Sequence, residues 1–174
     1  MQPTLGDVVV THMPHSLLAR SASRLATLVT VCALTMTVLV VAPTAPAEAA
    51  TGAQKYSRSA QKATNAVRVK RDRVRLTGDR CLRQHARRHA RAMARQGSIW
   101  HQDMQAVLEA CDLTMVGENV AMGYPTGRAA VRKGWMKSPG HRANILRRQY
   151  RLGVVAAAKG DDGLWYAAQL FGRR

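Results

Sequence analysis

The sequence contains few aromatic residues and lacks several motifs of catalysis. Of 174 residues only 5% are aromatic, and phenylalanine occurs once. Aromatic and basic residues do not alternate in the way that stacks nucleic-acid bases, so we expect no specific nucleic-acid partner. No serine lies in a Gly-x-Ser-x-Gly elbow, and no glycine-rich loop could cradle a phosphate. Serine hydrolases of that type and phosphate-loop proteins are therefore excluded.

Acidic residues are also scarce. The chain has 10 Asp and Glu against 27 Lys and Arg, which gives a formal net charge of +17. Such a charge attracts anionic cell-wall polymers, lipid surfaces and other polyanions. A compositional bias toward alanine and arginine would produce the same charge, and the sequence leaves both interpretations open.

Charged residues are rare at the N-terminus. Arg20 and Arg24 precede an uncharged stretch over residues 25–42, and small residues follow at Ala47-Glu48-Ala49. This order predicts a cleavable secretory signal peptide over residues 1–49, with Met13 as an alternative start, and therefore a secreted protein. If it is not cleaved, the same stretch would anchor the protein in a membrane.

Cysteine is rare as well, with three in the chain. Cys32 lies in the apolar part of the predicted signal, so export leaves Cys81 and Cys111. A lone pair in an exported protein predicts a disulfide, closing a loop of about thirty residues that contains His101.

Periodicity predicts one domain over residues 59–174, after a flexible segment over residues 50–58. Helices are expected over residues 59–73, 80–95, 105–110 and 126–137, and from Pro139 onward; Asp79 and Ser138 provide N-caps and Gly97 a stop. Residues 115–121 form a loop or strand, and strands over 151–159 and 164–171 are joined by a turn at 161–163. Both faces of these strands are apolar and need cover on both sides. The sequence therefore predicts an α+β fold, a three-layer α-β-α sandwich with a central antiparallel sheet.

The helix over residues 80–95 carries two further patterns. One is a basic stripe, which is either a solvated face or an anion-binding surface, at Arg83, Arg87, Arg91 and Arg95. The other is the pair His85 and His89, which lacks the glutamate of a zinc protease motif. We interpret these two histidines as partly buried packing residues.

His101, Glu118 and His141 lie at the ends or edges of predicted elements. Two imidazoles and a carboxylate suit a divalent transition metal and leave a coordination position open. His141 falls on the first turn of the helix that Ser138 caps, where the helix N-terminus disfavours a cation. We therefore expect a neutral imidazole there, the form that binds metal.

The motifs around these residues resemble the CAP superfamily, the cysteine-rich secretory, antigen 5 and pathogenesis-related proteins with an SCP-like domain. The resemblance extends over about residues 60–171 and rests mainly on VGENV at 116–120 and SPGHRANIL at 138–146. It implies a cavity lined by two histidines and two glutamates that can hold a divalent cation. His101, Glu118 and His141 match three of the four, and Ser138 lies near the fourth. The second glutamate is absent, as in the bacterial branch, because Trp135 is followed by Met136-Lys137-Ser138.

Three functions follow as hypotheses. The first is a secreted, monomeric binding protein that requires no cofactor and binds Zn²⁺ or a similar ion only weakly. The second is a metal-dependent hydrolase that uses His101, Glu118 and His141 around an activated water. The third is a basic protein that binds a polyanion. The missing second carboxylate argues against an enzyme. Asn119 and Asn144 are interpreted as structural amides, and Trp135 as a core residue.

Overall fold

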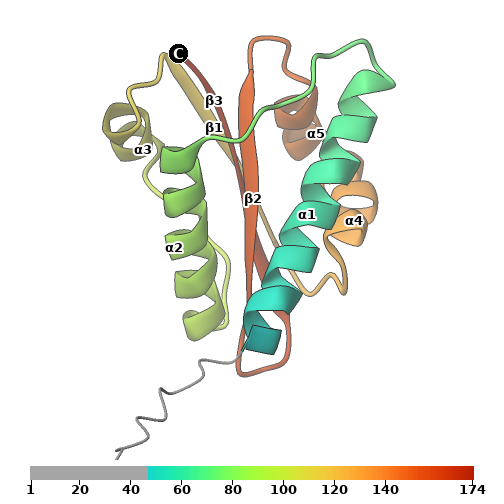
Figure 1. The fold of residues 1–174 in the computed structure, drawn as a ribbon, viewed down its shortest axis with the longest axis vertical. Coiled ribbons are helices and arrows are strands. Elements are labelled where there is room, and N and C mark those ends of the chain that lie inside the picture. The colour runs from blue at the N-terminus through green and yellow to red at the C-terminus, as the bar shows by residue number, and fades with distance from the viewer. Residues whose placement is uncertain (1–46) are drawn as a thin grey trace, which may run out of the picture. The chain divides into compact units, whose positions relative to one another are not determined.

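The computed structural model describes residues 47–174 and shows three layers (Figure 1). The predicted signal peptide, apart from its last three residues, lies outside the described residues, and so does Cys32. In chain order the elements are α1 (Ala47–Val69), α2 (Arg80–Gln96), α3 (Met104–Ala110), β1 (Met115–Met122), α4 (Gly127–Ala129), η1 (Ala130–Gly134), η2 (Trp135–Lys137), α5 (Pro139–Leu146), β2 (Leu152–Lys159) and β3 (Trp165–Arg173).

The three strands form one antiparallel sheet in the order β1-β3-β2, with Leu170 of β3 opposite Glu118 on one side and Val154 on the other. Helices α2 and α3 cover one face of the sheet, and α1, α4 and α5 cover the other (Figure 1). The predicted α+β fold, a three-layer α-β-α sandwich, is confirmed.

Each face of the sheet has its own hydrophobic core. Leu170 packs on the α2 side with Leu82 and Met93, whereas its neighbour Phe171 packs on the α1 side with Trp135. Successive strand residues point to opposite faces, so a strand covered on both sides must be apolar throughout. The apolar residues on both faces of the strands therefore predicted the three layers.

Helix α1 begins earlier than the sequence predicted. We expected a flexible segment over residues 50–58 and a helix from Ser59, but the helix already begins at Ala47 and ends at Val69. Tyr56 is 4% exposed, and its ring lies 5.1 Å from that of Trp165 on β3. This long-range contact holds a segment that looks polar and unstructured in the sequence.

The segment over residues 126–137 is not the single helix that we predicted. It divides into α4, a π-helical turn η1 and a 3₁₀ turn η2. Gly134 departs from helical geometry at φ −97° and ψ −88°, and a Cβ there would lie 2.7 Å from the ring of Tyr124. The close approach of Tyr124 thus requires glycine at the break.

Several local signals hold in the structure. The Asp79 carboxylate accepts a hydrogen bond from the amide of Leu82, and Gly97 ends α2 in the left-handed conformation at φ +67°. The Cys81–Cys111 disulfide is present. The Ser138 side chain is an exception, because it makes no capping hydrogen bond to α5. No helix within residues 47–174 has the length and apolar character needed to cross a membrane.

Candidate functional site

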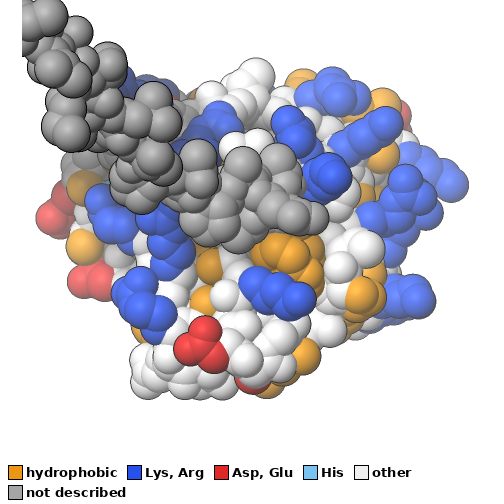
Figure 2. All heavy atoms as spheres, turned by 60° about the horizontal axis from the view of Figure 1, so that its bottom comes forward, with side chains coloured by type: hydrophobic (Ala, Val, Ile, Leu, Met, Phe, Trp, Pro, Cys, Tyr) orange, Lys and Arg blue, Asp and Glu red, His pale blue; other side chains and the backbone are white. Residues whose placement is uncertain are grey.

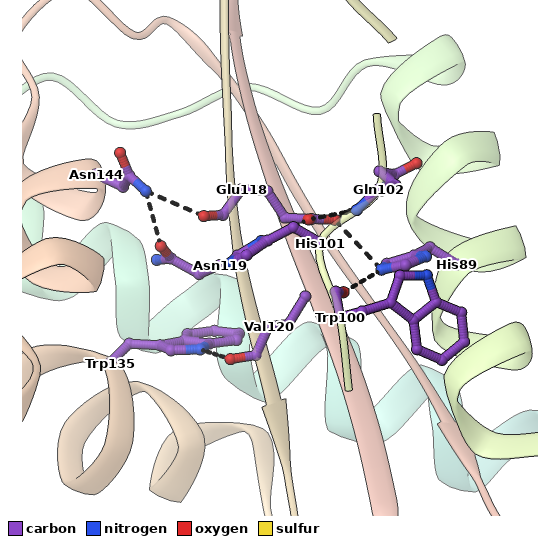
Figure 3. A network of polar contacts seen from close by, with 9 residues as sticks. All are labelled: His89, Trp100, His101, Gln102, Glu118, Asn119, Val120, Trp135 and Asn144. Carbon is purple, nitrogen blue, oxygen red and sulfur yellow. Dashed lines mark hydrogen bonds and ion pairs between the residues drawn. The ribbon is translucent and has the colours of Figure 1, made fainter. Parts of the chain in front are cut away.

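The site is built around the buried carboxylate of Glu118. The Glu118 side chain is 1% exposed and lies on β1, on the same face as Val120 and toward α2. Its Oε2 accepts hydrogen bonds from His101 Nδ1 at 2.8 Å and from the backbone amide of Gln102 at 3.2 Å; its Oε1 accepts one from Gln102 Nε2 at 2.7 Å (Figure 3). Both carboxylate oxygens are therefore used within the protein.

His101 is oriented by this carboxylate. A carboxylate only accepts hydrogen bonds, so Nδ1 of His101 is the donor and Nε2 is the ring nitrogen left available for a ligand. The His101 side chain is 58% exposed. The pair thus holds an imidazole in one tautomer at the surface, an arrangement also found in carboxylate–histidine–metal centres.

His89 joins the site, although we interpreted it only as a packing residue. Its side chain is 6% exposed, and Nε2 lies 2.7 Å from the carbonyl oxygen of Trp100 and 3.8 Å from Oε1 of Glu118 (Figure 3). Because a carbonyl only accepts, Nε2 is the protonated nitrogen. A histidine within the apolar stripe of α2, next to Ala90, was the signal for this role; Gln102 gave no signal in the sequence.

His141 lies at the start of α5, close to His101. Burial and, second, the charge of His101 hold the pKa of His141 below its ordinary value. The direction is the one that we expected, and burial is its largest cause. The backbone carbonyl of His141 accepts a hydrogen bond from Asn119 Nδ2 at 3.2 Å. The Ser138 side chain makes no described contact with these residues.

The free edge of β1 is covered by side chains. Three outward carbonyl groups at alternate positions accept hydrogen bonds: Val116 from the Tyr150 hydroxyl, Glu118 from Asn144 Nδ2 and Val120 from Trp135 Nε1. The interpretation of Asn144 as a structural amide and of Trp135 as a core residue is confirmed. These contacts fix α5, and with it His141, against the strand that carries Glu118.

Gly117 lets this cover approach the strand. A Cβ at Gly117 would collide with the hydroxyl of Tyr150, the group that donates to Val116. The glycine before Glu118 is therefore required by the edge contact.

A metal-ligand geometry occurs at a second place. Within residues 47–174, one group of three side chains brings its ligand atoms within 4.8 Å of one another: Cys81, His85 and Cys111. Such a group could hold a metal, but its two sulfur atoms are bonded to each other and provide no thiolate. His85 lies beside the disulfide, and His89 lies beside Glu118. The ligand atoms of His101, Glu118 and His141 do not all lie within 4.8 Å of one another.

Basic residues dominate the surface. Figure 2 shows Lys and Arg side chains spread over one face and few acidic ones among them. The stripe at Arg83, Arg87, Arg91 and Arg95 is exposed on α2. Within the described part of the chain, the ion pairs are Arg174–Asp79 and those of His89 and His101 with Glu118, so the stripe arginines have no acidic partner there.

Three hollows of about 510, 380 and 590 Å³ lie on the surface. None of the three is lined by His101, Glu118, His141 or Ser138. The site is therefore a buried carboxylate beneath an exposed imidazole, outside these three hollows.

Comparison with known proteins identifies relatives of this fold. The family model of the CAP proteins, the cysteine-rich secretory protein family, matches residues 61–171. No curated protein matches the sequence.

Solved structures from three bacteria are similar at 17–23% identity, which shows the fold alone. An extracellular SCP-domain protein of Bacillus anthracis has a TM-score of 0.63 at 23% identity, over 76% of this chain and 45% of that one. An outer surface protein of Borrelia burgdorferi has a TM-score of 0.59 at 21% identity, over 66% and 89%. A cysteine-rich secretory protein of Staphylococcus aureus has a TM-score of 0.56 at 17% identity, over 75% and 41%. This chain thus spans less than half of the first and third relatives.

Proposed function

The chain belongs to the CAP family of cysteine-rich secretory proteins, and we propose that it acts outside the cell as a binding protein rather than as an enzyme. Export is supported by the predicted signal peptide, the disulfide and the Bacillus anthracis relative, which is described as extracellular. In this function His101 and His141 contact the ligand, and Glu118 positions His101.

The occupied carboxylate of Glu118 carries the proposal. A hydrolytic metal centre holds its ion with three protein ligands and leaves a position for water. Both oxygens of Glu118 already accept hydrogen bonds from His101 or Gln102, and the side chain is 1% exposed, so it is poorly placed to act as the third ligand. The chain also lacks the second carboxylate, which would serve as an acid or base. These observations favour binding over hydrolysis.

The residues fit a divalent cation only in part. His101 Nε2 and the neutral imidazole of His141 are suitable ligands, whereas Glu118 is suited to the supporting role of orienting His101. A cation held there would attract an anionic oxygen of the ligand. Two imidazoles in a strongly basic protein bind such an ion weakly compared with structural zinc sites.

Calorimetric titration with Zn²⁺ at about pH 7.5 and about pH 5.5 tests this arrangement. We expect weak binding that is lost at the lower pH, where imidazoles protonate, and is abolished by His101→Ala or His141→Ala. The variant Glu118→Gln should keep the site but bind roughly 10- to 100-fold more weakly, as for other residues that orient metal ligands. Circular dichroism confirms that each variant is folded. Tight binding at both pH values, or binding that survives both histidine substitutions, would overturn the arrangement.

A Zn²⁺-dependent esterase or peptidase activity that His101→Ala removes would instead establish the hydrolase.

A second candidate function is the binding of an anionic polymer, favoured by the net charge of +17 and by the exposed Lys and Arg side chains that form no ion pair within residues 47–174.

A further inference from the structure

We propose that a groove between α1, η1, η2 and α5 holds a linear polymer of polyol units joined by phosphodiesters. This inference rests on the polyanion-binding function and gives it a specific site, away from Glu118. The groove has a volume of about 380 Å³, and its lining residues are Val67, Lys70, Arg71, Arg132, Met136, Lys137 and Arg142. Five of these seven residues are cations, and none is acidic.

The cations of the groove are not used by the protein itself. Their side chains are exposed, and within residues 47–174 they make no described ion pair or side-chain hydrogen bond. Neighbouring arginines behave differently: Arg68 donates to four backbone carbonyls, and Arg73 donates to Leu146. Five like charges around one hollow repel one another, and an anion in the groove would relieve that repulsion.

The walls of the groove are fixed before any ligand binds. Arg68 of α1 is fully buried, and its guanidinium donates to the carbonyl oxygens of Ile145 at the end of α5 and of Tyr150 beyond it. Helices α1 and α5 lie on the same side of the sheet (Figure 1). Cations held on braced elements bind at a lower entropic cost than cations on mobile loops.

The shape and lining of the groove select the class of polyanion. A hollow admits a chain, whereas a flat membrane would contact only its rim. The lining contains no aromatic residue on which a nucleic-acid base could stack. Val67 and Met136 instead give an apolar floor for the carbon atoms between successive phosphates. A polyol phosphate, with its short carbon units and regular charge, fits both features.

The test measures the affinity of a fluorescent oligo(glycerol phosphate) for the protein by anisotropy, from about 50 to 200 mM salt. One variant removes three groove charges: Arg71→Gln, Arg132→Gln and Arg142→Gln. Its matched control removes three charges from the stripe on α2: Arg83→Gln, Arg87→Gln and Arg91→Gln. All six positions are exposed, so both variants should fold and carry the same net charge.

We expect the groove variant to bind roughly 10-fold more weakly at low salt. The slope of log affinity against log salt should fall by about 2, because each of the three lost contacts contributes about 0.7 to the slope. The control should stay within about 3-fold of the wild type. Equal losses in both variants would reveal diffuse attraction, and a larger loss in the control would place the site on the stripe. Either result would overturn the assignment of the groove as the binding site but keep the polyanion-binding function. Absence of binding in the wild type would refute both.

Two further probes identify the source of the phosphates. A single-stranded DNA with the same number of phosphates should bind no more tightly than the glycerol phosphate chain. Tighter binding of the DNA that depends on the groove would overturn the polyol assignment. Groove-dependent binding to anionic phospholipid vesicles in preference to the chain would replace it with a membrane surface. His101→Ala should bind the chain like the wild type, since the groove does not include His101.

Discussion

The indole Nε1 of Trp135 donates a hydrogen bond to the backbone carbonyl oxygen of Val120 at 2.9 Å. With the matching bonds from Asn144 to Glu118 and from Tyr150 to Val116, it covers the free edge of β1. An open strand edge exposes unpaired backbone groups on which other chains can assemble. Here side chains occupy that edge, and the same contacts hold α5 beside the Glu118 strand.

Removing the indole donor should destabilise the domain. Trp135 is 1% exposed, and Trp135→Phe leaves the carbonyl of Val120 without its donor, so we expect a loss of about 1–3 kcal/mol in the free energy of unfolding. Urea denaturation measures it. Trp100→Phe, at a residue that is 36% exposed, is the control and should change stability by less than about 0.5 kcal/mol. Similar values for the two variants would show that the edge contact contributes little.

Arg68 should be among the most sensitive positions outside the site. Arg68→Met keeps an apolar stem but leaves the buried carbonyls of Ile145 and Tyr150 unpaired, so we expect a loss of about 3–5 kcal/mol. The control is Arg71→Met, two residues beyond the end of α1, where the side chain is exposed and the expected change is within about 0.5 kcal/mol. If the two variants unfold at the same denaturant midpoint, the structural role of Arg68 is contradicted.

The disulfide should contribute measurably to stability. Cys81 and Cys111 are 30 residues apart in sequence, and closing a loop of that length restricts the unfolded chain by about 3–4 kcal/mol. We expect the double variant Cys81→Ser with Cys111→Ser to lose that amount in urea denaturation. Addition of a reductant should destabilise the wild type and leave the double variant unchanged. An unchanged wild type in reductant, with the thiols shown to be free, would contradict the prediction.

Stability should fall as the pH falls below neutrality. Burial lowers the pKa of His141, with the charge of His101 as second cause, and burial followed by the charge of Arg88 lowers that of His85. Unfolding restores an ordinary pKa of about 6.5, so the unfolded state binds more protons in this range. This contribution is fully present above about pH 6.5 and is lost as the pH falls through the folded pKa values.

Urea denaturation of the wild type at several pH values between about 7.5 and 5 measures this loss. The variant carrying His85→Gln and His141→Gln should show a shallower dependence on pH. A dependence as steep as that of the wild type would assign the effect to other groups.

Local signals in the sequence were sufficient for most of the fold. The carboxylate of Asp79, the left-handed turn at Gly97 and the turn at 161–163 act over a few residues, and short-range chemistry decides them. Strands that are apolar on both faces required cover on both sides, which gave the three layers. The motif around Glu118 indicated the family, and the two cysteines predicted the disulfide.

Contacts between distant residues decided what the sequence could not. Trp165 lies more than a hundred residues beyond Tyr56, and their packing makes a helix of a segment that we expected to be flexible. The segment that we predicted as one helix over residues 126–137 is divided, and the ring of Tyr124 packs against Gly134 where the helical geometry is lost.

The role of Glu118 was also decided by the tertiary structure. The sequence identified Glu118 and His101 as partners in one site, because their residue types and motif are local features of the chain. Only the fold brings the side chain and amide of Gln102 to the same carboxylate and places His89 beside it. A buried carboxylate must be satisfied by donors within the protein, and the spatial arrangement of those donors supports the proposed role of Glu118 in positioning His101.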